Sequence, residues 1–245
     1  MRYTNDDFTR AFCKKTNTYN NYTEKSIIKK GTVAVSVILI AAFCVLAYLV
    51  TRSYTQSFDD AFRDMVYALR TSVLTFAAKG FSYAGDIQGV GAACIIFLIV
   101  PVTRKKLGIP VAAVVVVTQC AKKVIKMLIA RPRPPLTDRL VFEDGFSFPS
   151  GHSITSMAIC ILAVYFIQTE MKSRAAAKVL SIFIILFGIG IGASRIYLGV
   201  HYPTDVLGAW LLSSAAAFAA IAAIQHIKRK SPERLENRPK YRAKH

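Results

Sequence analysis

Charged side chains are scarce in this chain, and acidic ones especially so. Only 19% of its 245 residues are charged, against 53% that are hydrophobic, and the mean hydropathy is +0.39. Such a composition excludes an ordinary soluble domain and indicates an integral membrane protein. The 32 basic residues outnumber the 14 acidic ones, giving a formal charge of +18. Because the basic residues form short runs beside apolar stretches, with no nucleic-acid-binding motif, we expect membrane-topology signals and no nucleic-acid partner.

The cysteines also lack any pattern. None of the five has metal-ligand spacing. Cys13 lies in the polar amino-terminal segment, and four lie in apolar stretches: Cys44, Cys94, Cys120 and Cys160. This predicts free thiols and argues against a disulfide framework or a zinc-binding motif. No cleavable signal peptide is expected, because about thirty polar residues precede the first apolar run and no small-residue cleavage site follows it. That run is expected to act as an uncleaved anchor.

Six apolar runs have roughly the length needed to cross the hydrocarbon core of a bilayer. They cover residues 31–51, 86–103, 107–129, 153–169, 176–198 and 203–227. The fourth is the shortest, and the third carries Lys122, Lys123 and Lys126 near its end, a polarity that we attribute to function. The sequence therefore predicts an all-α, polytopic membrane protein with six transmembrane helices.

Residues 57–82, between the first two runs, mix apolar and charged side chains. The apolar ones include Phe58, Phe62, Met65, Val66 and Leu69, and the charged ones Asp59, Asp60, Arg63 and Asp64. The pattern favours an amphipathic helix at the membrane interface. A seventh, poor span from Val66 onward is the alternative, which the acidic residues and Arg70 disfavour. The predicted organisation is an amino-terminal tail (1–30), a six-helix membrane domain (31–227) and a basic tail (228–245).

The positions of the basic residues predict the orientation. With six spans, 21 of the 32 lysines and arginines fall on one side of the membrane, within the two tails and the loops near residues 104–106 and 170–178. The positive-inside tendency then places both termini in the cytoplasm of a plasma-membrane protein. Because the chain changes side at each of the six spans, three polar motifs elsewhere in the chain are predicted to lie at the extracytoplasmic face.

These three motifs contain the candidate phosphate-binding and acid–base residues. They read Lys126-x6-Arg133-Pro134, Pro149-Ser150-Gly151-His152 and Ser194-Arg195-x5-His201-x3-Asp205. Phosphoryl transfer needs fixed donors around three charged oxygens, which the lysine and two arginines can provide. Ser150, as a helix cap, and Gly151, which has no side chain, would let amide hydrogens at a helix start approach an anion. The motifs together predict a phosphate site.

The two histidines and the aspartate add acid–base chemistry to that site. One helical turn after Pro203 could bring Asp205 to one imidazole nitrogen of His201, leaving the other nitrogen free to attack phosphorus. His152, at the edge of the anion site, is placed to protonate the leaving group.

The three motifs, between residues 126 and 205, resemble the tripartite signature of the type 2 phosphatidic acid phosphatase superfamily. The resemblance implies the helical core that this superfamily shares with haloperoxidases. It also implies that His201 is the nucleophile that forms a phosphohistidine, that Asp205 orients it, and that His152 is the general acid. The implied phosphate ligands are Lys126, Arg133, Ser150, Gly151 and Arg195.

Several nearby polar residues have two interpretations. Arg131 and Arg139 are either further ligands or, more simply, interfacial anchors. The acidic residues Asp138, Glu143 and Asp144 fit a solvated loop better than a metal site. Asp86 fits a helix cap, and Trp210 fits packing inside the sixth span. We expect no metal or cofactor, because a zinc ion on the two histidines would occupy the nitrogens that the chemistry needs, and the arginines would repel it.

The expected substrate is a lipid phosphate or diphosphate whose tail stays in the bilayer. Family resemblance places undecaprenyl diphosphate first, then phosphatidylglycerophosphate and phosphatidate. The alternatives are a lipid phosphotransferase, a vanadate haloperoxidase and a non-catalytic lipid-binding protein. Besides the membrane and its lipids no partner is implied, and the sequence sets no oligomeric state.

Overall fold

The computed structural model describes residues 31–230, and all of them belong to helices or to the loops between them. The predicted tail at 1–30 lies outside the described residues, as does the part of the predicted tail 228–245 that follows Lys230. The helix Gly31–Thr51 comes first. The later elements are α2 (Gln56–Ala68), α3 (Ser72–Ala84), α4 (Ile87–Ile99), α5 (Pro101–Thr103), η1 (Arg104–Gly108), α6 (Ile109–Ile129), η2 (Leu136–Asp138), α7 (Gly151–Glu170), α8 (Arg174–Tyr197) and α9 (Pro203–Lys230).

Between residues 31 and 230, five helices are long and apolar enough to cross a membrane, or up to six if a bent pair counts as one span. The five are Gly31–Thr51, Arg104–Ile129, Gly151–Glu170, Arg174–Tyr197 and Pro203–Ile227. All-α architecture is thus confirmed, and these helices match five of the six predicted runs to within three residues at each end.

The predicted second span, residues 86–103, is wrong as a single helix. Its helix α4 has only 13 residues, about 20 Å of rise, which is less than the ~30 Å hydrocarbon core. The sixth candidate span instead joins α3 to α4 through a 46° bend. Gly85 lies at this bend, where a Cβ atom would come within 2.5 Å of Ile191 Cγ2. The close approach of α8 therefore requires glycine at this position.

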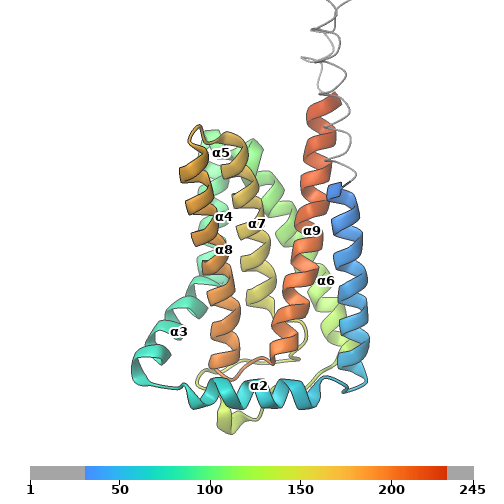
Figure 1. The fold of residues 1–245 in the computed structure, drawn as a ribbon, viewed down its shortest axis with the longest axis vertical. Coiled ribbons are helices and arrows are strands. Elements are labelled where there is room, and N and C mark those ends of the chain that lie inside the picture. The colour runs from blue at the N-terminus through green and yellow to red at the C-terminus, as the bar shows by residue number, and fades with distance from the viewer. Residues whose placement is uncertain (1–30, 231–245) are drawn as a thin grey trace, which may run out of the picture.

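The amphipathic segment at 57–82 is also two helices rather than one. It breaks at residues 69–71, where Thr71 accepts a hydrogen bond from Leu74 N–H at the start of α3. The Arg70 side chain is held by the carbonyls of Tyr197 and Asp138, at 2.8 and 2.9 Å. Helix α2 alone lies across the end of the bundle (Figure 1), and α3 turns upward toward α4. No separate span starts at Val66.

The centre of the bundle is α7, which packs against α6, α8 and α9. One buried cluster joins Val111 and Val114 of α6 to Leu162 of α7 and Ile221 of α9. On α8, a Cβ atom at Gly192 would lie 2.6 Å from Trp210 Cζ2, so Trp210 packs against the helix as expected. Large apolar side chains remain exposed around the outside of the bundle, as expected for a surface in contact with lipid tails.

Figure 1 shows how the helix ends are distributed. The start of the first helix and the end of α9 lie at one end of the bundle. The end of α6, the start of α7, the end of α8 and the start of α9, which carry or adjoin the three motifs, lie at the opposite end, where α2 crosses. This is the arrangement that an even number of crossings requires. It brings together the ends of α6, α7, α8 and α9 that carry the polar residues.

The orientation can be tested with single cysteines in a chain whose five native cysteines are replaced by alanine. Thr137 and Ser173 are both exposed and lie at opposite ends of the bundle. A membrane-impermeant thiol reagent applied to intact cells should label Thr137→Cys and leave Ser173→Cys unlabelled until the membrane is permeabilised. The reverse pattern would place the motifs in the cytoplasm.

Candidate active site

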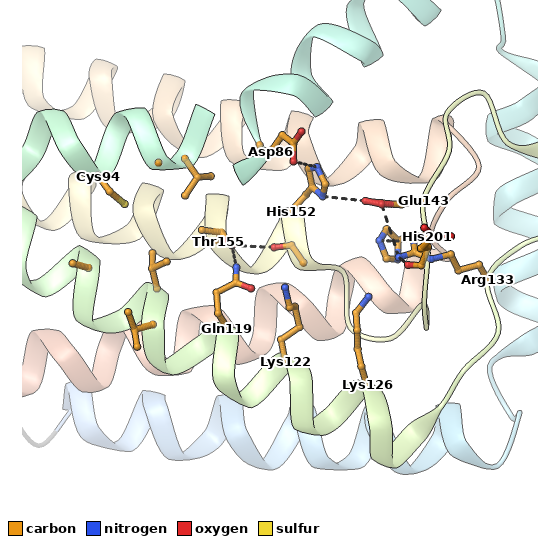
Figure 2. A pocket seen from close by; sticks show the side chains of 18 residues that line it. Asp86, Cys94, Gln119, Lys122, Lys126, Arg133, Glu143, His152, Thr155 and His201 are labelled. Atoms are coloured by element: carbon orange, nitrogen blue, oxygen red, sulfur yellow. Dashed lines mark hydrogen bonds and ion pairs between the residues drawn. The ribbon is translucent and has the colours of Figure 1, made fainter. Parts of the chain in front are cut away.

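A cavity of about 710 Å³ opens between α4, α6 and α7 and contains much of the predicted chemistry. Its polar end is lined by Lys122, Lys126, Arg133, Glu143, His152 and His201. Its other end is mostly apolar, with Val90, Cys94, Val115 and Val116. Figure 2 shows Lys122 and Lys126 extending from α6 toward the two histidines. The cavity therefore combines a cationic head with an apolar extension.

Arg133 is the residue that connects the loops at the polar end. Its Nε donates to Gly145 O at 2.9 Å, and its Nη2 donates to Asp144 O at 2.8 Å. Its Nη1 donates to Val200 O at 2.9 Å and lies 3.2 Å from His201 Nε2. Lys126, the other cation of the first motif, donates to Phe146 O at 2.5 Å. Both cations are thus fixed at the cavity by backbone carbonyls.

The second motif begins α7, although Ser150 does not cap it in the expected way. Ser150 occupies the cap position, but its side chain makes no capping hydrogen bond to the helix. It is buried, and its hydroxyl accepts a hydrogen bond from Ser153 Oγ at 2.9 Å. Gly151 does line the cavity, and a Cβ atom there would lie 3.3 Å from Lys122 Nζ. Glycine therefore leaves the start of α7 open to the cavity and to Lys122.

The geometry around His201 identifies its tautomer. A guanidinium group can only donate, so the contact with Arg133 requires a lone pair on His201 Nε2. The proton then lies on Nδ1, which is 3.4 Å from Asp205 Oδ2. Burial lowers the pKa of His201 to about 3, although Asp205 acts in the opposite direction. The imidazole is therefore neutral at physiological pH, with the Nε2 lone pair facing Arg133.

Two carboxylates flank His152, which lies at the start of α7. Its Nδ1 is 3.7 Å from Glu143 Oε1, and its Nε2 is 3.7 Å from Asp86 Oδ1. Asp86 was expected only as a helix cap, yet its carboxylate faces this histidine across the bend between α3 and α4 (Figure 2).

Glu143 occupies the centre of the cationic cluster, which corrects its assignment to a solvated loop. One carboxylate oxygen accepts a hydrogen bond from Arg195 Nη2 at 2.7 Å, and the other lies 4.0 Å from Arg133 Nη2. Arg195 is almost fully buried and also donates to Ser82 Oγ. A carboxylate and a phosphate offer similar acceptors to an arginine, so Glu143 lies where a phosphate would be expected to bind. The sequence does not reveal this, because acidic residues are ordinary in loops.

Lys122 is the cavity cation that the motifs do not include. It lies one turn before Lys126 on the same face of α6, a spacing that could have identified it. Arg139 does not line the cavity. Its guanidinium donates to the carbonyls of Pro134 and Glu143, at 2.6 and 3.3 Å. Arg139 is therefore no further phosphate ligand in this structure.

Arg131 is neither an exposed anchor nor a ligand at the cavity. It is buried, with ion pairs of 2.6 Å to Asp59 and 2.7 Å to Asp205. Its guanidinium also lies over the Tyr202 ring, 4.1 Å from the centroid. Asp59 was expected on the polar face of an amphipathic helix, yet it is the buried residue of α2. Long-range pairing, which sequence spacing does not encode, accounts for both differences.

The first and third motifs and the start of α7 thus meet at one cavity. Lys126, Arg133, Gly151, His152 and His201 line it. Arg195 reaches the same polar cluster through Glu143, Asp205 lies behind His201, and Ser150 is enclosed by α7. Within residues 31–230, no three histidine, cysteine or acidic side chains form a group that could hold a metal ion. The independence from metal stays a prediction.

A bundle of long apolar helices with this cation-lined cavity at one end is a multi-pass membrane protein. A family model described as the PAP2 superfamily matches residues 107–229. Phosphatidylglycerophosphatase B of Bacillus subtilis is 30% identical over 201 residues, which cover 78% of this chain and 95% of that protein. The chain belongs to the PAP2 superfamily, as its three motifs predicted.

Two further comparisons agree with this assignment. An undecaprenyl-diphosphatase of Sulfolobus acidocaldarius is 30% identical over 122 residues, covering 48% of this chain and 55% of that protein. The crystal structure of a transmembrane PAP2-type phosphatidylglycerolphosphate phosphatase from Bacillus subtilis superposes with a TM-score of 0.73 at 28% identity. The superposition covers 80% of this chain and 98% of the chain in that crystal structure.

The position of Glu143 generates a prediction about anion binding. Glu143→Gln removes a negative charge that competes with phosphate for Arg195, so inorganic phosphate should bind about tenfold more tightly, equivalent to ~1.4 kcal/mol. Titration calorimetry on the purified protein measures this. Asp138→Asn, which removes the same charge from a loop position outside the cavity, should leave phosphate affinity unchanged. Equal or weaker binding by Glu143→Gln would show that Glu143 does not occupy the phosphate position.

Proposed function

We propose that the protein hydrolyses a membrane lipid phosphate through a phosphohistidine on His201. The observation that carries this proposal is the pairing at that imidazole, with Arg133 at Nε2 and Asp205 facing Nδ1. The pairing keeps the proton on Nδ1 and turns the Nε2 lone pair, which Arg133 contacts at 3.2 Å, toward a cavity lined with cations. Membership of the PAP2 superfamily supports the same chemistry.

In the first step, the Nε2 lone pair of His201 attacks phosphorus and the bond from phosphorus to the lipid oxygen breaks. His152, at the start of α7 and protonated at this stage, donates its proton to the departing oxygen. Negative charge on the three equatorial oxygens is stabilised by Lys126, Arg133 and Arg195. Glu143 must leave its present position, because phosphate and carboxylate cannot share the same donors.

In the second step, a water molecule attacks the phosphohistidine. His152, now neutral, accepts the proton of that water as the bond between phosphorus and Nε2 breaks. Inorganic phosphate leaves and both histidines return to their starting states. Throughout the cycle, Asp205 holds the Nδ1 proton of His201 and stabilises the positive charge that develops on the ring.

The shape of the cavity supports a lipid substrate. Its apolar end runs along α4, α6 and α7. Between this end and the lysines, Gln119 Nε2 of α6 donates to Thr155 Oγ1 of α7 at 2.6 Å. A phosphate held at the polar end would leave an acyl or prenyl chain along the apolar residues, within the bilayer. The lipid would therefore be cleaved without leaving the membrane.

Phosphatidylglycerophosphate is the substrate that we place first. The order expected from the sequence, with undecaprenyl diphosphate first, is not confirmed. The relative that aligns over 201 residues is a phosphatidylglycerophosphatase, whereas the undecaprenyl-diphosphatases match shorter segments. Undecaprenyl diphosphate and phosphatidate follow. Proton delivery by His152 suits each of these leaving groups.

Phosphate release from the purified protein in detergent, with EDTA present, tests the proposal. The parent should release phosphate from phosphatidylglycerophosphate faster than from undecaprenyl diphosphate or phosphatidate. His201→Ala should lower the rate by at least about a thousandfold, because it removes the nucleophile. His226→Ala, a histidine substitution outside the cavity, is the matched control and should retain the parental rate.

The outcomes separate the alternatives. Parental activity in His201→Ala would exclude this residue as the nucleophile, and loss of activity with EDTA would contradict metal independence. Transfer of phosphate to an added lipid alcohol, without release, would identify a phosphotransferase. An inactive parent on all three lipids would contradict the proposed function.

A further inference from the structure

We infer that Asp59, on the helix that crosses the end of the bundle, is a positioning residue for the catalytic histidine, acting through Arg131 and Asp205. This inference rests on the proposed function. Asp59 belongs to none of the three motifs and lies 142 positions before His201 in the chain. It is nevertheless fully buried, with 0% of its surface exposed.

Every hydrogen bond that the Asp59 carboxylate accepts comes from Arg131 or Thr204, which adjoin Asp205. Its Oδ2 accepts from Arg131 Nη2 at 2.6 Å and from Thr204 Oγ1 at 2.7 Å. Its Oδ1 accepts from Thr204 N–H at 2.9 Å. Thr204 is in the first turn of α9, directly before Asp205, so Asp59 fixes the helix start that carries the orienting carboxylate.

Arg131 transmits this constraint to Asp205. Its Nη1 donates to Asp205 Oδ1 at 2.7 Å and to Thr204 Oγ1 at 2.8 Å. The other oxygen of Asp205, Oδ2, accepts from Tyr202 N–H at 2.8 Å and faces His201 Nδ1 at 3.4 Å. The two carboxylate oxygens are therefore held from opposite sides, and the plane of the carboxylate is fixed toward the imidazole.

The charges of this cluster give Asp59 a second effect. Arg131 paired with Asp205 alone would neutralise the carboxylate and weaken its hold on the Nδ1 proton. Asp59 shares the guanidinium, so Asp205 retains more of its negative charge toward His201. Burying three charges offers little net stability compared with apolar packing. A cluster that is costly to bury and ends at the nucleophile is explained better by function than by stability.

The test compares Asp59→Asn with Asp64→Asn, the same substitution at an exposed position of the same helix. Asp59→Asn keeps the shape and removes the charge. We expect kcat to fall by about 10- to 100-fold, as for other residues that orient a catalytic group, with KM within about twofold of the parent, because no phosphate ligand changes. Asp64→Asn should match the parent in both constants.

A spectroscopic measurement makes the test independent of the substrate. The chain has only four histidines, so the ring nitrogens of His201 can be assigned by ¹⁵N NMR with His201→Ala as the reference. The parent should show the Nδ1-protonated tautomer alone, and Asp59→Asn should show a mixture of tautomers. If the parent releases no phosphate, the proposed function fails, and the NMR result still decides the role of Asp59.

Thr204→Val supplies a second variant should Asp59→Asn fail to fold. It removes the hydroxyl that bridges Asp59 and Arg131 but keeps the backbone N–H contact and the side-chain shape. A smaller fall in kcat, of a few-fold, with constant KM and a partial tautomer mixture would support the inference. Parental kcat and a single tautomer in whichever variant folds would overturn it. A rise in KM that accounts for the whole loss would also overturn it.

Discussion

The structure at the end of the bundle that holds the cavity depends on one buried carboxylate, that of Asp205. Arg131, from the segment after α6, pairs with one of its oxygens at 2.7 Å. Ser147, from the loop before α7, donates to the other oxygen, which also faces His201. The backbone carbonyl of Asp205 accepts from Ser150 N–H at 3.1 Å. The two ends of the connection between α6 and α7 are thus joined to the start of α9 at one residue. These contacts compensate the large desolvation cost of a buried carboxylate in an apolar bundle.

The same cost of desolvation explains the arrangement of the cations. Arg133 and Lys126 are held by backbone carbonyls, and Arg195 is held by Glu143. Without a phosphate, the acidic side chain of Glu143 compensates part of this positive charge. The substrate phosphate would take over that compensation. Pre-positioned cations need little reorganisation during the reaction, which is the main requirement for stabilising a phosphoryl group in transfer.

Sequence patterns predict those features of this protein that depend on residues close together in the chain. Runs of apolar residues identify the five continuous spans, and three short motifs identify the family and five of the residues that line the cavity. The bend at Gly85 could not be predicted, because it depends on how closely α8 approaches. The pairings of Asp59 with Arg131 and of Glu143 with Arg195 connect residues 72 and 52 positions apart. Such contacts are set by the tertiary fold, so a charged helix face and a solvated loop were reasonable but wrong interpretations.

Trapping the phosphorylated enzyme tests the proposed phosphohistidine on His201 most directly. The purified parent is mixed with lipid substrate labelled with ³²P at its terminal phosphate, quenched within milliseconds in alkali, where phosphohistidine survives, and mapped by mass spectrometry. We expect acid-labile label on His201 and on no other residue, formed before phosphate is released. Phosphate release with no labelled protein at any time point, or label on His152 in place of His201, would contradict this proposal.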